Sequence, residues 1–122
     1  ANADSFFSQV PWYLVVLDEV HKVKNPATRT YQALQLLDCP RRIGLSGTPV
    51  QNNLKELHAI MSVVVPQDMW YTIGAFENQF SMLIETGRQR DVSIHGAKAG
   101  KRARDKLDKV LSRHLLRRTK AI

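Results

Sequence analysis

Apolar residues occur first in a strand-like run and later at helical spacing. Residues 13–17 read Tyr-Leu-Val-Val-Leu without a polar break, which is typical of a strand buried on both faces of a parallel sheet. Asn25-Pro26 then marks a turn, and the spacing that follows predicts a helix over about 27–38. Residues 42–45, Arg-Ile-Gly-Leu, read as a second short strand. This order predicts a parallel βαβ unit with a right-handed crossover.

The pattern becomes helical after the second strand. Asn53, with Glu56 three residues later, resembles a capping box at the start of a helix. Further helices are expected over about 72–85, with Phe76 and Phe80 facing inward, and over 101–115, with Ala103 and Leu107 on one apolar stripe. The segment 87–100 between them is polar and rich in Gly and Ala, which predicts a mobile loop. The expected class is therefore α/β, with a parallel βαβ unit followed by several helices.

The chain of 122 residues is 43% hydrophobic, which favours one globular domain or part of one. Its longest apolar runs are about five residues, far below the roughly 20 that span a bilayer. A single cysteine, Cys39, excludes an internal disulfide and favours a reducing compartment such as the cytoplasm or nucleus. Two strands are few for an α/β domain, so we expect a piece of a larger one.

The net charge of +7 is concentrated near the C-terminus. Residues 88–120 hold 12 basic and three acidic residues, whereas the remainder has six basic and eight acidic ones. Such asymmetry favours a polyanionic partner, most often nucleic acid. A solvated helix face is the alternative explanation.

Polar residues follow both predicted strands. Asp18 and Glu19 come directly after the first strand, and Ser-Gly-Thr-Pro at 46–49 follows the second. The carboxyl ends of parallel strands form the edge at which ligands bind. A magnesium-binding carboxylate and a general base at this edge make nucleotide hydrolysis the first hypothesis. Taken alone, an Asp-Glu pair after a strand is more often a helix N-cap, and Ser-Gly-Thr-Pro is simply a turn.

Three blocks resemble motifs of the Snf2-family, helicase-like ATPases of superfamily 2. Residues 16–25 (VLDEVHKVKN) resemble motif II, and residues 42–57 resemble motif III with its Gly-Thr-Pro, Gln-Asn and Glu-Leu elements. Residues 115–120 (LLRRTK) are similar to the signature that closes the first ATPase lobe. Val20 stands where the family usually has Ala, and we expect the turn to tolerate its extra bulk. Residues 80–85 and the basic helix resemble the Cockayne-syndrome-B-like, excision-repair-related branch.

The resemblance implies a partial RecA-like (P-loop NTPase) lobe. Residues 1–122 would be the C-terminal part of lobe 1, divided into a motif II/III core (1–65) and a helical, basic extension (66–122). Residues 96–102 fail as a P-loop because three residues separate the glycines and Arg102 replaces the Ser or Thr. The P-loop part of lobe 1 and the second lobe are thus implied partners. Without them we expect no ATPase activity and some self-association through the edge of strand 42–45.

The resemblance also assigns roles to the motif residues. Asp18 would hold the Mg²⁺ bound to ATP, and Glu19 would orient or deprotonate the attacking water. His21 would sense the nucleotide and connect it to motif III. The coupling residues of motif III would be Ser46, Gly47 and Thr48. The four histidines and Cys39 lack metal-ligand spacing, so no metal site within the protein itself is assigned.

Candidate contacts to double-stranded DNA form three groups. The first group either approaches the DNA backbone or braces the motif loops, and comprises Lys24, Asn25, Gln51 and Asn52. The second is a stripe on the last predicted helix, made of Arg102, Lys106, Lys109 and Arg113. The third contacts DNA or the second lobe, or is a solvated helix end, and consists of Arg117 and Arg118.

The resulting hypothesis is a fragment of a nuclear, ATP-dependent double-stranded DNA translocase that acts in repair or chromatin remodelling. A piece of a DEAH-type RNA helicase is one alternative, although those proteins usually carry Ser-Ala-Thr where this chain has Ser-Gly-Thr. The other alternative is a non-catalytic basic module that binds nucleic acid or protein.

Overall fold

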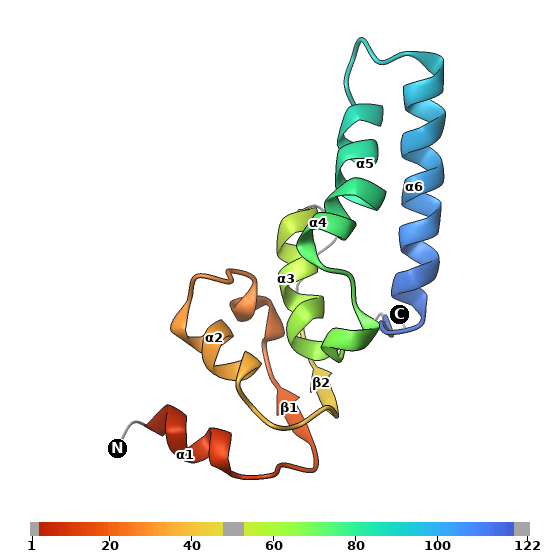
Figure 1. The fold of residues 1–122 in the computed structure, drawn as a ribbon. Coiled ribbons are helices and arrows are strands. Elements are labelled where there is room, and N and C mark those ends of the chain that lie inside the picture. Colours follow the sequence, from red (N-terminus) through yellow and green to blue (C-terminus); the bar gives the residue numbers. More distant parts are fainter. Residues whose placement is uncertain (1–2, 48–52, 119–122) are drawn as a thin grey trace. The chain divides into compact units, whose positions relative to one another are not determined.

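The computed structural model describes residues 3–47 and 53–118 and divides the chain into two compact units (Figure 1). Unit 1 is Ala1–Tyr71 and unit 2 is Thr72–Ile122. Unit 1 contains α1 (Ala3–Gln9), β1 (Val15–Leu17), η1 (Val20–Val23), α2 (Arg29–Gln35), β2 (Arg42–Gly44), α3 (Leu54–Val64) and η2 (Gln67–Met69). Unit 2 contains α4 (Ile73–Phe76), the π turn η3 (Glu77–Ser81), α5 (Met82–Gly87) and α6 (Ile94–Ser112). The expected boundary follows residue 65, and the assignment of 1–65 and 66–122 to a motif core and an extension stays a prediction.

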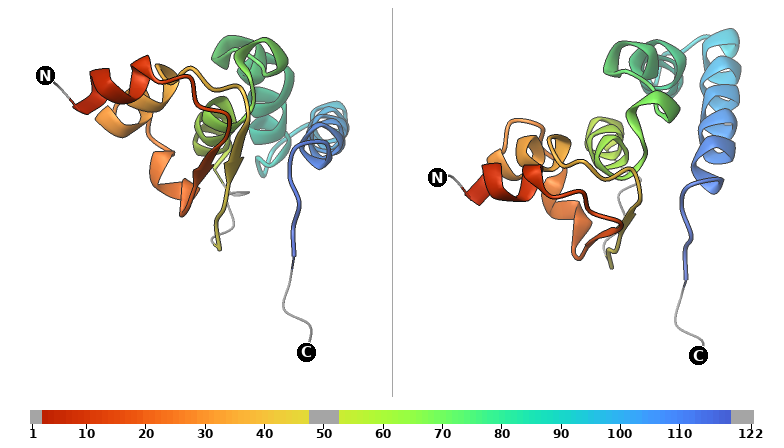
Figure 2. Two further views of the ribbon diagram at one scale, coloured as in Figure 1. Left: turned by 90° about the horizontal axis from the view of Figure 1, so that it is seen from below. Right: turned by 60° about the horizontal axis from the view of Figure 1, so that its bottom comes forward.

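β1 and β2 form a two-stranded parallel sheet, which confirms the predicted βαβ unit (Figure 2). Val16 lies opposite Ile43, and Leu17 lies opposite Gly44. The Leu45 amide donates to the Leu17 carbonyl over 2.8 Å. Because both strands run the same way, the turns that follow them meet at one edge of the sheet.

The two faces of this sheet differ in burial. Val16 and Ile43 share one face and are 53% and 48% exposed. Leu17 packs on a cluster formed by Val20, Val23, Ile60 and Val63, and β2 contacts α3. The expectation that the strands are buried on both faces is therefore wrong for the described residues. Among them, α3 covers one face of the sheet, and the face with Val16 and Ile43 is exposed.

Side-chain caps fix the starts of the helices in unit 1. The Thr28 hydroxyl accepts from the Tyr31 amide over 3.3 Å, so α2 begins later than the sequence suggests. The Asn53 side-chain oxygen accepts from the Glu56 amide over 3.1 Å, which confirms the predicted cap of α3.

Unit 2 is a pair of neighbouring helical segments, with α4, η3 and α5 following one path beside α6 (Figure 1). Phe76 and Phe80 are fully buried, with ring centroids 5.2 Å apart. Leu107 of α6 is equally buried, and Ala103 lies near the same depth. These side chains are the inward-facing ones that helical spacing predicts. None of the described helices has the length and apolarity needed to cross a bilayer.

The prediction of a loop over 87–100 is wrong from Ile94 onward, where the chain is helical. α6 begins at Ile94, where the Ser93 hydroxyl accepts from the Gly96 amide over 3.1 Å. A Cβ at Gly100 would lie 2.8 Å from the Leu83 carbonyl and 3.0 Å from the Gly87 Cα. The glycines thus permit close helix packing, and residues 96–102 lie within α6 rather than in a phosphate-binding loop.

Candidate functional site

The turn after β1 carries two exposed acidic residues at the carboxyl edge of the sheet. Asp18 accepts the Glu19 amide through Oδ1 over 2.9 Å. Glu19 has φ 54° and ψ 49°, and among the described residues it is the single non-glycine with positive φ. This left-handed conformation costs an ordinary residue about 1–2 kcal/mol. The turn is therefore strained at the residue predicted to be the general base.

His21 connects this turn to the residues after β2. Its Nδ1 lies 3.0 Å from the Ser46 Oγ and 3.3 Å from the Glu19 Oε2. A proton on Nδ1 would be donated toward both oxygens, since the hydroxyl oxygen and the carboxylate can each accept a hydrogen bond. The structure thus brings together three of the predicted residues from two separate motifs.

Val20 anchors the motif II turn to the rest of unit 1. The Val20 amide donates to the Leu45 carbonyl over 2.8 Å. The Val20 side chain is only 7% exposed and packs with Val23 and Ile60. The turn is consequently attached to β2 by its backbone and to the core by its side chain.

Two members of the first group of predicted DNA contacts, Lys24 and Asn25, make contacts within unit 1. The Asn25 side chain accepts the Ala27 amide over 3.0 Å, and its carbonyl accepts from the Thr28 hydroxyl over 2.9 Å. The Lys24 ammonium lies 3.7 Å from a Glu56 carboxylate oxygen. Gly47 is exposed beside Ser46. The predictions for Thr48, Gln51 and Asn52 fall outside the described residues.

Arg42 is a structural residue that the motif reading missed. Its guanidinium donates to the carbonyls of Leu37, Cys39 and Val63 over 2.8–2.9 Å. Burial lowers the pKa of Arg42, and interaction with Cys39 opposes that change. These bonds tie β2 to the ends of α2 and α3. The sequence signal for this role was an arginine at a strand position that faces inward, because a buried charge needs hydrogen-bond partners.

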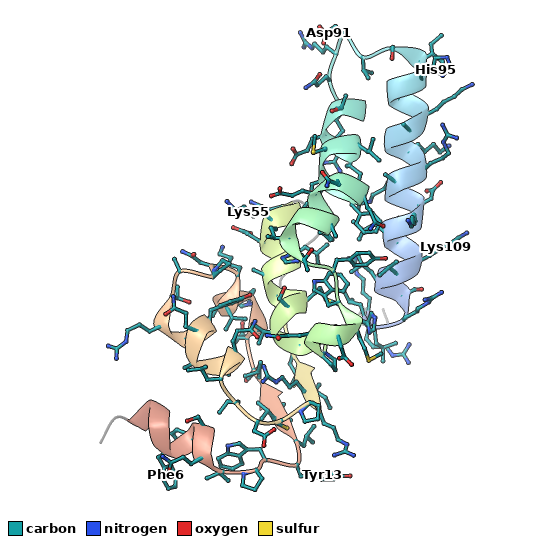
Figure 3. The ribbon with its side chains drawn as sticks, in the orientation of Figure 1. Phe6, Tyr13, Lys55, Asp91, His95 and Lys109 are labelled. Atoms are coloured by element: carbon teal, nitrogen blue, oxygen red, sulfur yellow. The ribbon has the colours of Figure 1, made fainter. Side chains whose placement is uncertain are left out.

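The basic stripe of α6 is exposed, but its members differ. Arg102, Lys109 and Arg113 are exposed, and Figure 3 shows Lys109 directed away from α5. The Lys106 ammonium donates to Gln79 over 3.2 Å and lies 5.7 Å from the Phe80 ring centre. Arg117 and Arg118 are exposed beyond the end of the helix.

A groove elsewhere in unit 1 does not coincide with this turn. It encloses about 490 Å³ and is lined by Phe7 and by residues of α2 and the turn that follows it. The candidate site therefore rests on the meeting of the two strand ends.

Several DNA repair proteins are similar to this chain in sequence. The mouse DNA excision repair protein ERCC-6-like 2 is 36% identical over 115 residues, which cover 94% of this chain and 7% of that protein. Human DNA excision repair protein ERCC-6 is 35% identical over 114 residues, covering 93% and 8%. The chicken DNA repair and recombination protein RAD54-like is 38% identical over 109 residues, covering 89% and 15%. The chain thus spans a small part of these relatives. The two excision repair proteins among them confirm the expected excision-repair-related branch.

A solved structure shares the fold. It is the SWI2/SNF2 ATPase core of Sulfolobus solfataricus in complex with double-stranded DNA, with 28% identity and a TM-score of 0.74. The match covers 95% of this chain and 22% of that chain, and it confirms a partial RecA-like lobe. The model of the SNF2-related domain matches residues 2–122. The chain belongs to the SNF2-related domain family.

Proposed function

We propose that this chain supplies the hydrolysis and coupling residues of an ATP-dependent, double-stranded DNA translocase. The observation that carries the proposal is the contact of His21 with both Glu19 and Ser46. It joins an acidic turn after one strand to a hydroxyl turn after its parallel neighbour. Phosphoryl transfer needs such positioning and charge neutralisation more than it needs covalent chemistry.

Asp18 fits a role in holding the Mg²⁺ that accompanies ATP. Its carboxylate is exposed at the carboxyl edge of the sheet, and the described residues contain no group of three or more His, Cys, Asp or Glu that could form a metal cage. Mg²⁺ commonly binds through one or two carboxylates, with phosphates and waters completing the shell. Such an ion would neutralise phosphate charge during hydrolysis.

Glu19 acts in this proposal as the base that orients or deprotonates the attacking water. Its carboxylate is half exposed and lies against His21. His21 in turn holds the Ser46 hydroxyl, so a change at the nucleotide is transmitted to motif III, where Gly47 and Thr48 complete the coupling motif. Alternating engagement of the second lobe would convert this change into movement.

The basic surface of α6 supplies DNA contacts in the same proposal. The four solvent-exposed cations of the stripe can neutralise phosphates: Arg102, Lys106, Lys109 and Arg113. Arg117 and Arg118 contact DNA or the second lobe. The Sulfolobus ATPase core was solved in complex with double-stranded DNA, which supports duplex DNA over RNA as the partner of this chain. The repair and recombination names of the relatives support a nuclear location.

The test compares ATP turnover by the intact protein with duplex DNA, with RNA and without nucleic acid. Glu19→Gln should keep ATP binding and lower turnover by about 10²–10⁴-fold, because the amide cannot accept a proton. Asp18→Asn should weaken magnesium-dependent binding instead. Glu85→Gln, a change of the same kind on the exposed surface of α5, is the matched control and should leave turnover unchanged.

Near-normal turnover by Glu19→Gln would contradict the assignment of the base. Stimulation by RNA but not by duplex DNA would instead favour an RNA helicase. Absence of any ATP turnover in the wild-type protein would favour a non-catalytic module.

A further inference from the structure

Gly44 of β2 lies directly beneath the motif II turn. A Cβ built there would lie 2.9 Å from the Val20 Cγ2, and 3.1 Å from both Cβ and Cγ1 of the same residue. All three contacts are with one short, branched side chain, which has no flexible end that could move aside. Every described glycine has negative φ. Gly44 is therefore needed for space rather than for its backbone conformation.

Val20 cannot move away from Gly44 without disturbing the turn. Its amide is bonded to the carbonyl of Leu45, the residue after Gly44. Its side chain is buried in one cluster with Val23, Ile60 and Val63. Added volume at position 44 must therefore displace the Val20 backbone, which directly follows the strained Glu19.

We propose that Gly44 is a positioning residue, whose missing side chain seats Val20 and thereby sets the placement of the Glu19 carboxylate. Val20 is bulkier than the Ala usual in motif II, and the space above Gly44 accommodates that bulk. This inference rests on the proposed function for its effect on turnover. The seating of Val20 itself is independent of any activity.

Three variants of the intact protein test the pair: Gly44→Ala, Val20→Ala, and both together. Gly44→Ala should lower kcat about 10- to 100-fold, because displacement of a reacting group by about 1 Å has effects of this size. KM for ATP should change by less than about threefold, since the change affects the chemical step. The double variant, which removes two methyl groups and adds one, should regain most of the lost kcat.

Hydrogen exchange gives a readout that needs no activity. The Val20 amide should exchange faster in Gly44→Ala and return to the wild-type rate in the double variant. Gly74→Ala is the matched control, because a Cβ at Gly74 meets nothing within 4 Å. Leu57→Ala, at a buried side chain of α3 outside the Val20 cluster, controls for loss of packing: it should lower stability without altering kcat at temperatures well below unfolding.

The outcomes separate the two claims. Faster exchange with loss of kcat, both reversed in the double variant, supports the proposal. Unchanged exchange in Gly44→Ala, or a double variant that recovers neither property, overturns it. Altered exchange with unchanged kcat overturns the positioning role. If Gly44→Ala is insoluble, recovery of soluble, active protein in the double variant supports the pair, and its failure counts against it. If ATP turnover by the wild-type protein does not depend on Glu19, the proposed function is overturned. The hydrogen-exchange test of Val20 still applies in that case.

Discussion

The two units differ in their secondary structure and in their charge. Unit 1 has two strands of three residues each, and side-chain bonds to the backbone complete its turns and helix ends. Unit 2 relies on contact between helices, with fully buried Phe76, Phe80 and Leu107. Unit 1 carries six basic and six acidic residues, whereas unit 2 carries 12 basic and five acidic ones. Both units have a buried apolar core, but the candidate site lies in unit 1 and most of the basic charge lies on unit 2.

Phe80→Ala should give the largest effect and should be confined to unit 2. Loss of a fully buried Phe costs about 3–5 kcal/mol, because a cavity remains in place of the ring. We expect hydrogen exchange in the intact protein to show lost protection in α5 and α6, with protection retained in β1 and β2. Met82→Ala, at a side chain 59% exposed, should change stability by about 0.5 kcal/mol or less. Equal loss of protection in both units would show that they unfold together.

Replacing Arg102, Lys106, Lys109 and Arg113 by Ala should weaken DNA binding without altering sequence preference. Each phosphate contact contributes about 0.9 to the slope of log K against log salt, so the slope should fall by about 3–4. Lys55→Ala, which removes an exposed lysine of unit 1 (Figure 3), should leave the slope nearly unchanged. Binding titrations over a series of salt concentrations measure both. An unaltered slope in the variant with all four replacements would show that the stripe is only a solvated helix face.

Gly100→Ala should destabilise unit 2 although it replaces glycine inside a helix. Helix propensity favours Ala by about 1 kcal/mol, but the added Cβ would lie 2.8 Å from the Leu83 carbonyl. Overpacking of this kind typically costs about 1–3 kcal/mol. Gly74→Ala has open space and should be stabilising. Thermal unfolding of both variants checks the contrast, and a more stable Gly100→Ala would refute the close approach of α5 and α6.

Glu19→Gly should have the smallest effect on stability and the opposite sign. Glycine tolerates the left-handed conformation, so the variant should gain up to about 1 kcal/mol, reduced by the greater freedom of its unfolded chain. Turnover should be lost because the proposed base is gone. Chemical unfolding and ATPase assays on the same preparation test whether stability rises while turnover is lost. A destabilised variant would contradict this prediction.

The sequence predicts the features that depend on local chemistry. The two strands, their parallel pairing and the Asn53 cap follow from apolar runs and capping residues, and the structure confirms them. The inward positions of Phe76 and Phe80 follow from helical spacing in the same way. These features require no knowledge of distant residues.

Features that depend on distant neighbours escape such reasoning. Gly100 reads as a helix breaker until the Leu83 carbonyl is known to lie against it. The left-handed backbone of Glu19 and the 3.0 Å approach of His21 to Ser46 depend on how two turns meet across the sheet. The exposure of Val16 depends on which side α3 covers. Tertiary packing overrides local propensity in each case.

Arg42 also has a consequence for the order in which unit 1 forms. Its bonds reach carbonyls five and three residues before it and one 21 residues after it. Arg42 can therefore donate to the carbonyls of both Leu37 and Val63 only after β2 has packed against the ends of α2 and α3. Closing the loop between Arg42 and Val63 costs conformational entropy before the hydrogen bond between them can form. We expect β2 and the ends of α2 and α3 to assemble in one cooperative step, so that Arg42→Ala slows folding as well as lowering stability.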